Sequence, residues 1–137
     1  MRKKKSPREA VLKYVLEQYG TSPEYTFESD PEIAVLRHKA GRKWYGIIMN
    51  VPKSKLGLSG DERIDILNVK CDPAVSGSMC LNAGIYPGYH MNKQHWISIL
   101  LDGTVEMSMI EMLIDASFEL TAVKVRKKSP QNNVMCK

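Results

Sequence analysis

The sequence predicts a single domain of the α+β class, with a mostly antiparallel sheet and helices packed on it. Its 137 residues suit one domain built around one core. Strand-like segments follow one another through short turns, as antiparallel neighbours do. Two other segments begin with a hydrogen-bond acceptor followed by proline, which is typical of helix starts.

The first helix is predicted to begin at Ser6. Ser6 can cap it, Pro7 suits the first helical position, and Glu9 stands where a capping box places its carboxylate. Gly20 is expected to end the helix. The side chains that mark its apolar face are Val11, Tyr14, Val15 and Tyr19. The polar, turn-rich residues 21–31 are expected to form a loop, with room for a short extended piece.

Three strands are predicted next. Segments 32–38 and 43–51 flank residues 39–42, which favour a hairpin turn. The aromatic and β-branched content of the second segment is typical of a central strand, and Pro52 ends it. After an expected loop at 53–62, residues 63–70 are apolar on both faces, which indicates cover on both sides of the sheet at one end.

The second half of the chain predicts a short helix, a strand and a strong helix. Asp72-Pro73 starts a helix over 73–81 that Gly77 weakens, and residues 96–101 alternate as a strand does, with room for a short strand before them. A helix is then expected to run to about residue 125. Its apolar positions follow helical spacing: Ile110, Leu113, Ile114, Ser117, Phe118 and Thr121.

The net charge of +5 is unevenly distributed along the chain. Five basic residues lie within residues 2–8 and five within 124–137, whereas the ten between them are outnumbered by fifteen acidic residues. The charge therefore indicates basic ends around a mildly acidic body, and the ends can be read simply as solvated tails. The absence of a long apolar run and the three unpatterned cysteines favour a cytoplasmic protein with reduced thiols.

Four stretches of the chain form a distinctive set: LNVKCDP at 67–73, PGYHMNKQHW at 87–96, LDG at 101–103 and LIDASFEL at 113–120. Together they resemble the MmcQ/YjbR family of small bacterial proteins. The resemblance covers residues 6–128, which we take as the domain, and leaves 1–5 as a basic extension and 129–137 as a polar tail that we expect to be disordered. It implies the order α-β(3)-α-β(2)-α, with a fourth strand just before or within residues 86–91.

The family is commonly described as predicted DNA-binding, with a "double-wing" motif, and the 87–96 stretch has suitable side chains for that role. Lysine and asparagine can contact phosphates and bases, and aromatic rings can stack on unpaired bases. We therefore predict a DNA-binding protein. The candidate contact residues are Lys70, Tyr89, His90, Asn92, Lys93, His95 and Trp96. The alternative interpretation is structural, with the histidines bracing a loop and Trp96 anchoring the next strand.

Other functions find less support in the sequence. Cys71, Cys80, His90 and His95 have zinc-ligand chemistry, but their spacing matches no common zinc motif. No nucleophile elbow, P-loop or dinucleotide-binding glycine pattern is present, so we expect neither an enzyme nor a cofactor nor a bound metal. The remaining alternative is a protein-interaction module, for which eight methionines supply adaptable contact surface. We expect a monomer.

Overall fold

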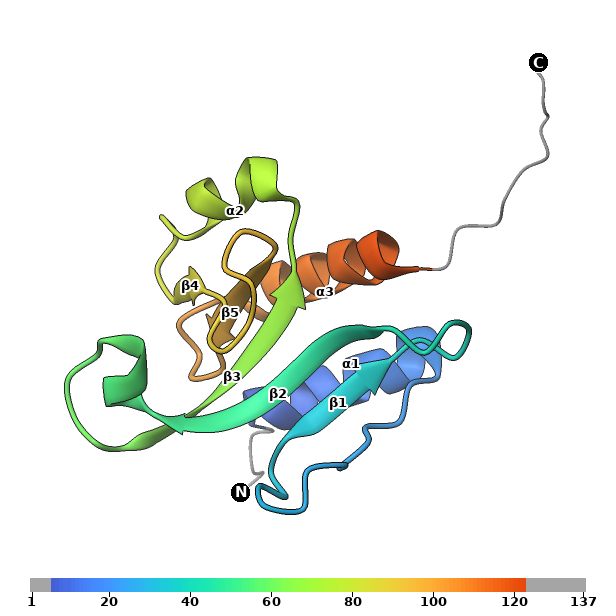
Figure 1. Cartoon of the computed structure of the whole chain (residues 1–137), viewed down its shortest axis with the longest axis horizontal. Helices are drawn as coiled ribbons and strands as arrows, with labels where there is room; N and C mark the ends of the chain where they lie inside the picture. Colours follow the sequence, from blue (N-terminus) through green and yellow to red (C-terminus); the bar gives the residue numbers. More distant parts are fainter. Residues whose placement is uncertain (1–5, 123–137) are drawn as a thin grey trace, which may run out of the picture.

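The computed structural model describes residues 6–122, which form one five-stranded antiparallel sheet with three α-helices (Figure 1). The strand order in the sheet is β1-β2-β3-β5-β4. Along the chain the elements are α1 (Pro7–Tyr19), β1 (Ala34–Arg37), β2 (Trp44–Pro52), the 3-10 helix η1 (Lys53–Leu56), β3 (Arg63–Lys70), α2 (Pro73–Met79), β4 (Ile85–Pro87), β5 (Trp96–Leu100) and α3 (Met107–Thr121). The predicted α+β class and the order α-β(3)-α-β(2)-α are confirmed.

The ends of helix α1 form as the sequence predicts. The Ser6 hydroxyl accepts a hydrogen bond from the Glu9 N–H at 3.2 Å, and the Glu9 carboxylate accepts one from the Ser6 N–H at 3.1 Å. Gly20 ends the helix in the left-handed conformation at φ 69°, and its N–H donates to the last carbonyls of the helix. Local capping chemistry therefore sets both boundaries.

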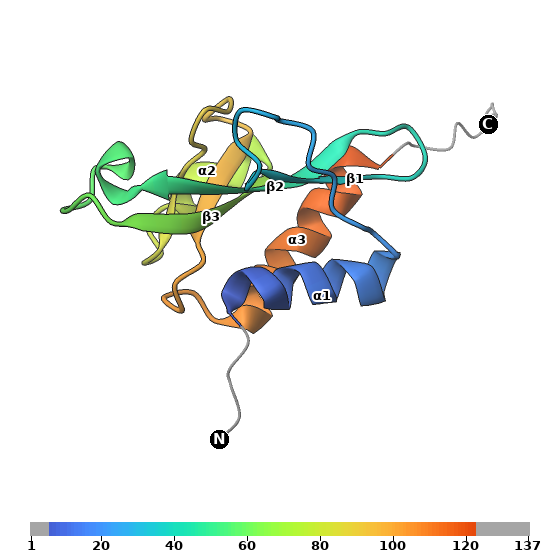
Figure 2. The ribbon, with the colours of Figure 1, turned by 90° about the horizontal axis from the view of Figure 1, so that it is seen from below.

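Helices α1 and α3 cover one face of the sheet (Figure 2). Val11 and Val15 of α1 and Ile110 and Ile114 of α3 are almost fully buried there. A β-bulge adds an aromatic side chain to this core: Leu36 faces Gly46 and Arg37 faces Trp44, so Tyr45 is the extra residue. Its ring contacts the rings of Tyr19, His38 and Phe118.

Several boundaries differ from the predicted ones. Strand β1 is shorter than the predicted 32–38, because Ile33 donates to the Asp30 carbonyl in a turn and His38 lies beyond the strand, buried against α3. The expected loop 53–62 opens with η1, and α2 ends at Met79 instead of residue 81. The fourth strand is present as β4. The last helix ends at Thr121, where Ala122 is already extended, instead of running on to about residue 125. The basic residues 1–5 and the tail 129–137 lie outside the described residues.

Within residues 6–122, the structure contains no helix that is both long and apolar enough to span a lipid bilayer.

Candidate functional site

The face of the sheet opposite α1 and α3 is covered by connecting segments instead of α-helices, and two of these segments pack on the buried cluster around β3 (Figure 2). The first is residues 53–58, which follow β2, and the second is residues 88–95, which connect β4 to β5 and are called here the 88–95 loop. Leu56 and Tyr89 pack on a buried cluster that includes Ile64 and Ile66. Cover on both faces of β3 is thus confirmed, and the family-like motif forms part of that cover.

A buried polar pair fixes the 88–95 loop to the middle of the sheet. Asn68 of β3 and Ser98 of β5 are neighbours in the sheet, and both are 0% exposed. The Ser98 hydroxyl donates to the side-chain oxygen Oδ1 of Asn68. The pair also holds both backbone groups of Tyr89: the Asn68 amide donates to its carbonyl at 3.1 Å, and its N–H donates to Ser98 Oγ at 2.8 Å. The two polar side chains therefore provide hydrogen-bond partners for the buried backbone groups of the loop where it crosses the sheet.

The start of the loop needs glycine at position 88. A Cβ there would lie 2.8 Å from the Trp96 Cβ and 2.9 Å from the Trp96 carbonyl oxygen, both shorter than an ordinary contact. The next turn carries His90 at φ 60°, a left-handed conformation that few residues other than glycine adopt. The Lys93 ammonium closes the turn by donating to the Gly88 carbonyl at 2.9 Å. The loop thus has a defined shape that presents His90 at the surface.

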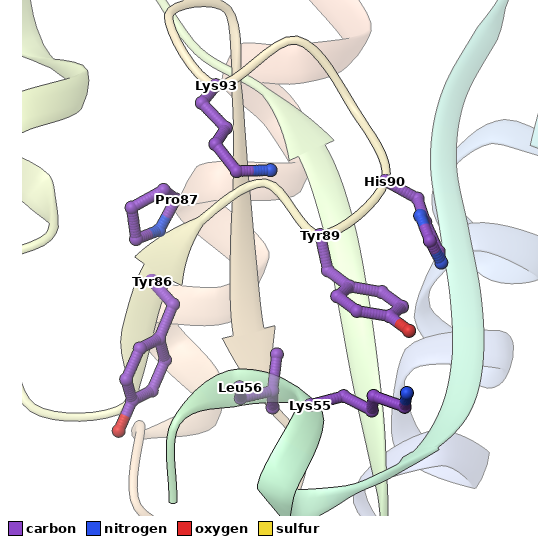
Figure 3. A pocket seen from close by; sticks show the side chains of 7 residues that line it. All are labelled: Lys55, Leu56, Tyr86, Pro87, Tyr89, His90 and Lys93. Atoms are coloured by element: carbon purple, nitrogen blue, oxygen red, sulfur yellow. The ribbon is translucent and has the colours of Figure 1, made fainter.

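A groove of about 400 Å³ lies between the two covering segments (Figure 3). Its walls are Lys55, Leu56, Tyr86, Pro87, Tyr89, His90 and Lys93, and it is called here the loop groove. The rings of Tyr86 and Tyr89 stand on opposite sides of it, with Leu56 between them (Figure 3). Each of the two segments contributes one lysine. The groove therefore combines aromatic faces with two cations.

The structure separates the seven residues that the sequence predicts as contacts. Tyr89, His90 and Lys93 line the loop groove. Asn92 is exposed on the loop, where its side-chain oxygen accepts a hydrogen bond from the Gln94 N–H at 2.9 Å. The other three lie at the far end of the loop: Lys70, His95 and Trp96. There the Lys70 ammonium lies 5.9 Å from the Trp96 ring centroid, and the His95 carbonyl accepts the Cys71 N–H at 2.7 Å.

Four lining residues were not predicted from the sequence: Lys55, Leu56, Tyr86 and Pro87. Lys55 and Leu56 belong to η1, which is 30 or more residues away from the motif and reaches it only through the β2–β3 hairpin. Tyr86 and Pro87 belong to β4, whose existence was implied only by the resemblance. The one usable signal was a lysine-containing turn directly after Pro52.

The structure offers little support for metal or thiol chemistry in the described part of the chain. Residues 6–122 contain no group of three or more His, Cys, Asp or Glu side chains arranged to hold a metal ion. Burial raises the pKa of the Cys71 and Cys80 thiols, with a smaller contribution from Asp72 and the neighbouring thiol for Cys71. A raised pKa disfavours the thiolate, which is the form that binds metals and attacks electrophiles.

Comparison with protein families identifies the chain. A family model described as YjbR matches residues 16–120. The chain belongs to the YjbR family. It is 53% identical over 114 residues to the uncharacterized protein YyaQ of Bacillus subtilis, an overlap of 83% of this chain and 97% of that protein. Over a shorter overlap of 69 residues, 47% of this chain and 54% of its relative, it is 36% identical to the uncharacterized protein YbdF of Escherichia coli O157:H7.

Solved structures share the fold of this YjbR-family chain. A crystal structure of a Pseudomonas syringae protein superposes with a TM-score of 0.82 at 42% identity, covering 84% of this chain and 98% of that one. A DUF419 domain of the Deinococcus radiodurans protein DR2400 superposes with a TM-score of 0.60 at 24% identity, covering 80% of this chain and 74% of that one. The second likeness concerns the fold alone.

Proposed function

We propose that this YjbR-family protein binds DNA, and that the loop groove contacts unpaired nucleotides. The observation that carries the proposal is the meeting of Lys55 and Lys93 with Tyr86 and Tyr89 around one groove, from two segments far apart in the sequence. Lysines attract phosphates, and base–aromatic stacking contributes about 1–3 kcal/mol per base without demanding a particular sequence. The groove binds and does not catalyse, and the protein works in the cytoplasm.

The charge distribution favours unpaired DNA over a long duplex as the ligand of the folded body. Nine of the twenty basic residues lie outside residues 6–122, which leaves eleven basic residues against fifteen acidic ones in the described part. A duplex presents a dense row of phosphates and calls for many cations along one surface. A short unpaired segment needs only the cations at the groove and uses the two tyrosine rings.

Fluorescence anisotropy with labelled single-stranded and duplex DNA, at low and at physiological salt, tests this proposal. We expect the full-length chain to prefer the single strand, with a slope of log K against log salt of about −1.4 for two phosphate contacts. Lys55→Gln and Lys93→Gln should each weaken binding about tenfold. Lys43→Gln removes the same charge at the other end of the β2 strand and should leave binding unchanged.

Two results would overturn the proposal. Absence of binding at low salt would exclude DNA as a ligand. A steep salt slope that neither groove substitution changes would show that DNA contacts basic residues elsewhere, such as those at the chain ends.

A protein partner is the second candidate function. Leu81 is 86% exposed and Val75, on α2, is 44% exposed, so two large apolar side chains lie in solvent close together in the chain. Exposed apolar side chains that gather on one surface are typical of interfaces. If this surface mediates self-association, the elution volume in gel filtration should shift with concentration, and Leu81→Ser should abolish the shift. A concentration-independent monomer volume would exclude self-association.

A further inference from the structure

The size of the loop groove sets a limit on what it can hold. Its volume of about 400 Å³ lies near the lower end of the range of about 300–1,000 Å³ for small-molecule pockets. Strand-binding domains, by comparison, track about 4–16 nucleotides along an open charged channel. The dimensions of the groove therefore suit one nucleotide and not a run of stacked bases.

The side chains around the groove match the parts of one nucleotide. Tyr86 and Tyr89 line the groove on either side of Leu56, which gives it an apolar wall with two aromatic side chains against which one base can pack (Figure 3). The Lys93 ammonium uses one of its three donors on the Gly88 carbonyl, at 2.9 Å, so it is held at the rim with two donors left. Lys55 reaches the groove from the other segment (Figure 3). The two ammonium groups lie apart, with Tyr89 between them (Figure 3), so one lysine binds the phosphate of a single nucleotide and the other attracts it from a greater distance.

The surroundings of the groove discourage a longer ligand. Past η1, the chain carries exposed Asp61 and Glu62 before β3 begins. The Glu62 carboxylate already pairs with Lys53 at 3.1 Å, so that lysine's charge is partly compensated. Phosphates that extended along this hairpin would meet acidic side chains. Electrostatics therefore favours a ligand whose charge ends close to the two lysines.

The groove is also fixed in shape before any ligand arrives. Asn68 and Ser98 hold the Tyr89 backbone from below, and Gly88 packs directly against Trp96. A preformed site loses little conformational entropy on binding, which favours a small ligand that contributes few contacts. The strained backbone of His90 is maintained by the same supports.

We infer that the loop groove binds a single unstacked nucleotide together with its phosphate, one unit at a time. This inference rests on the proposed function and narrows it to the size of the recognised unit. The same chemistry is available from a free nucleotide and from an unpaired nucleotide within a strand. In either case the base packs against the wall formed by the tyrosines and Leu56, and the phosphate lies at one of the two lysines.

Isothermal titration of the full-length protein with thymidine, thymidine 5′-monophosphate, a 5′-phosphorylated dinucleotide and a ten-nucleotide strand tests the inference. The monophosphate and the dinucleotide should bind with affinities within about threefold of the affinity per site on the longer strand, in contrast to proteins that require about 4–16 nucleotides. Thymidine, which has no phosphate, should bind at least about tenfold more weakly than the monophosphate. Lys55→Gln and Tyr86→Leu should weaken monophosphate binding, whereas the control Lys43→Gln should not.

The outcomes separate the inference from the proposed function. If the long strand binds and responds to Lys55→Gln, but the mono- and dinucleotide bind more than about tenfold more weakly, the single-nucleotide site is wrong while DNA binding at the groove stands. If no nucleotide or strand binds, both are wrong. Monophosphate binding that is unchanged in Lys55→Gln and Tyr86→Leu would place the nucleotide elsewhere and overturn the inference, and circular dichroism of each variant confirms that it is folded.

Discussion

Replacement of Asn68 by leucine is expected to destabilise the protein even though the site is completely buried. Leucine has a similar branched shape and would add apolar contact in a 0% exposed position. It would nevertheless leave two buried groups without their partner, the Tyr89 carbonyl at 3.1 Å and the Ser98 hydroxyl. A buried polar group that loses its hydrogen bond costs about 1–3 kcal/mol, so the expected net loss is about 2–4 kcal/mol.

The complementary substitution Ser98→Ala tests whether the pair acts as a unit. It removes the acceptor of the Tyr89 N–H, which lies at 2.8 Å, and the donor to Asn68. We expect a loss of about 1–3 kcal/mol. Each single substitution already leaves groups of the same hydrogen-bond network without partners. The free energy of unfolding of the double variant should therefore fall by less than the sum of the two single losses, by at least about 0.5 kcal/mol.

Urea denaturation of the two single variants and the double variant supplies the required free energies of unfolding. Hydrogen exchange at the Tyr89 amide, which should accelerate in Ser98→Ala, gives a local measurement. The matched control is Asn92→Ala, an exposed asparagine in the same loop that makes one local hydrogen bond to the backbone. If Asn68→Leu is no more destabilising than Asn92→Ala, or if the two buried substitutions are strictly additive, the pair does not anchor the loop and the reasoning fails.

Three further predictions concern the rest of the described chain. Gly88→Ala should lower the free energy of unfolding by about 1–3 kcal/mol, because the added methyl group overpacks the site. Gly77→Ala, in a helix with open space around it, should raise the free energy of unfolding by about 0.5–1 kcal/mol. Urea midpoints that move in the same direction in both variants would contradict this. Burial lowers the pKa of His38 in the folded protein, so on acidification the histidine of the unfolded chain binds a proton before that of the folded chain. The free energy of unfolding should therefore fall as the pH drops below about 6.5. An unchanged dependence of this free energy on pH in His38→Gln would refute the prediction. Burial alone would raise the pKa of Asp65, but hydrogen bonds and the charge of Arg8, 3.0 Å away, lower it overall. Its stabilisation should therefore be present above about pH 4 and be lost in more acidic solution, and Asp65→Asn should remove that part of the acid-unfolding curve.

Local signals along the chain were sufficient for most of the fold. The capping box at Ser6 and Glu9, the left-handed Gly20 and the acceptor–proline start at Asp72 all act within a few residues, so their outcome could be predicted without tertiary contacts. The periodicity of Ile110 and Ile114 likewise placed the last helix with its buried side correct. Strand β4, of only three residues, has too little local signal and was expected only through the family resemblance.

The candidate site was predictable only in part. The composition of the 88–95 loop drew attention to Tyr89, His90 and Lys93, and all three line the groove. The pairing of Asn68 with Ser98 was not visible, because both residues look like ordinary polar positions in strands until the sheet places them side by side. The bulge that turns Tyr45 toward the helices was invisible for the same reason: it depends on the register between β1 and β2.

By itself, the sequence determined the class of the fold, the order of its elements, the ends of its first helix and its membership in the YjbR family, because these follow from short-range chemistry and from a long, specific motif. Only the tertiary structure decided which side of the sheet the motif covers and which residues it meets there. Lys55 lines the same groove as Lys93 because β2, η1 and β3 carry one segment of chain back over the sheet. Contacts of this kind join residues far apart in the sequence, so they depend on how the sheet brings its strands and hairpins together, which the residues of the motif alone do not specify.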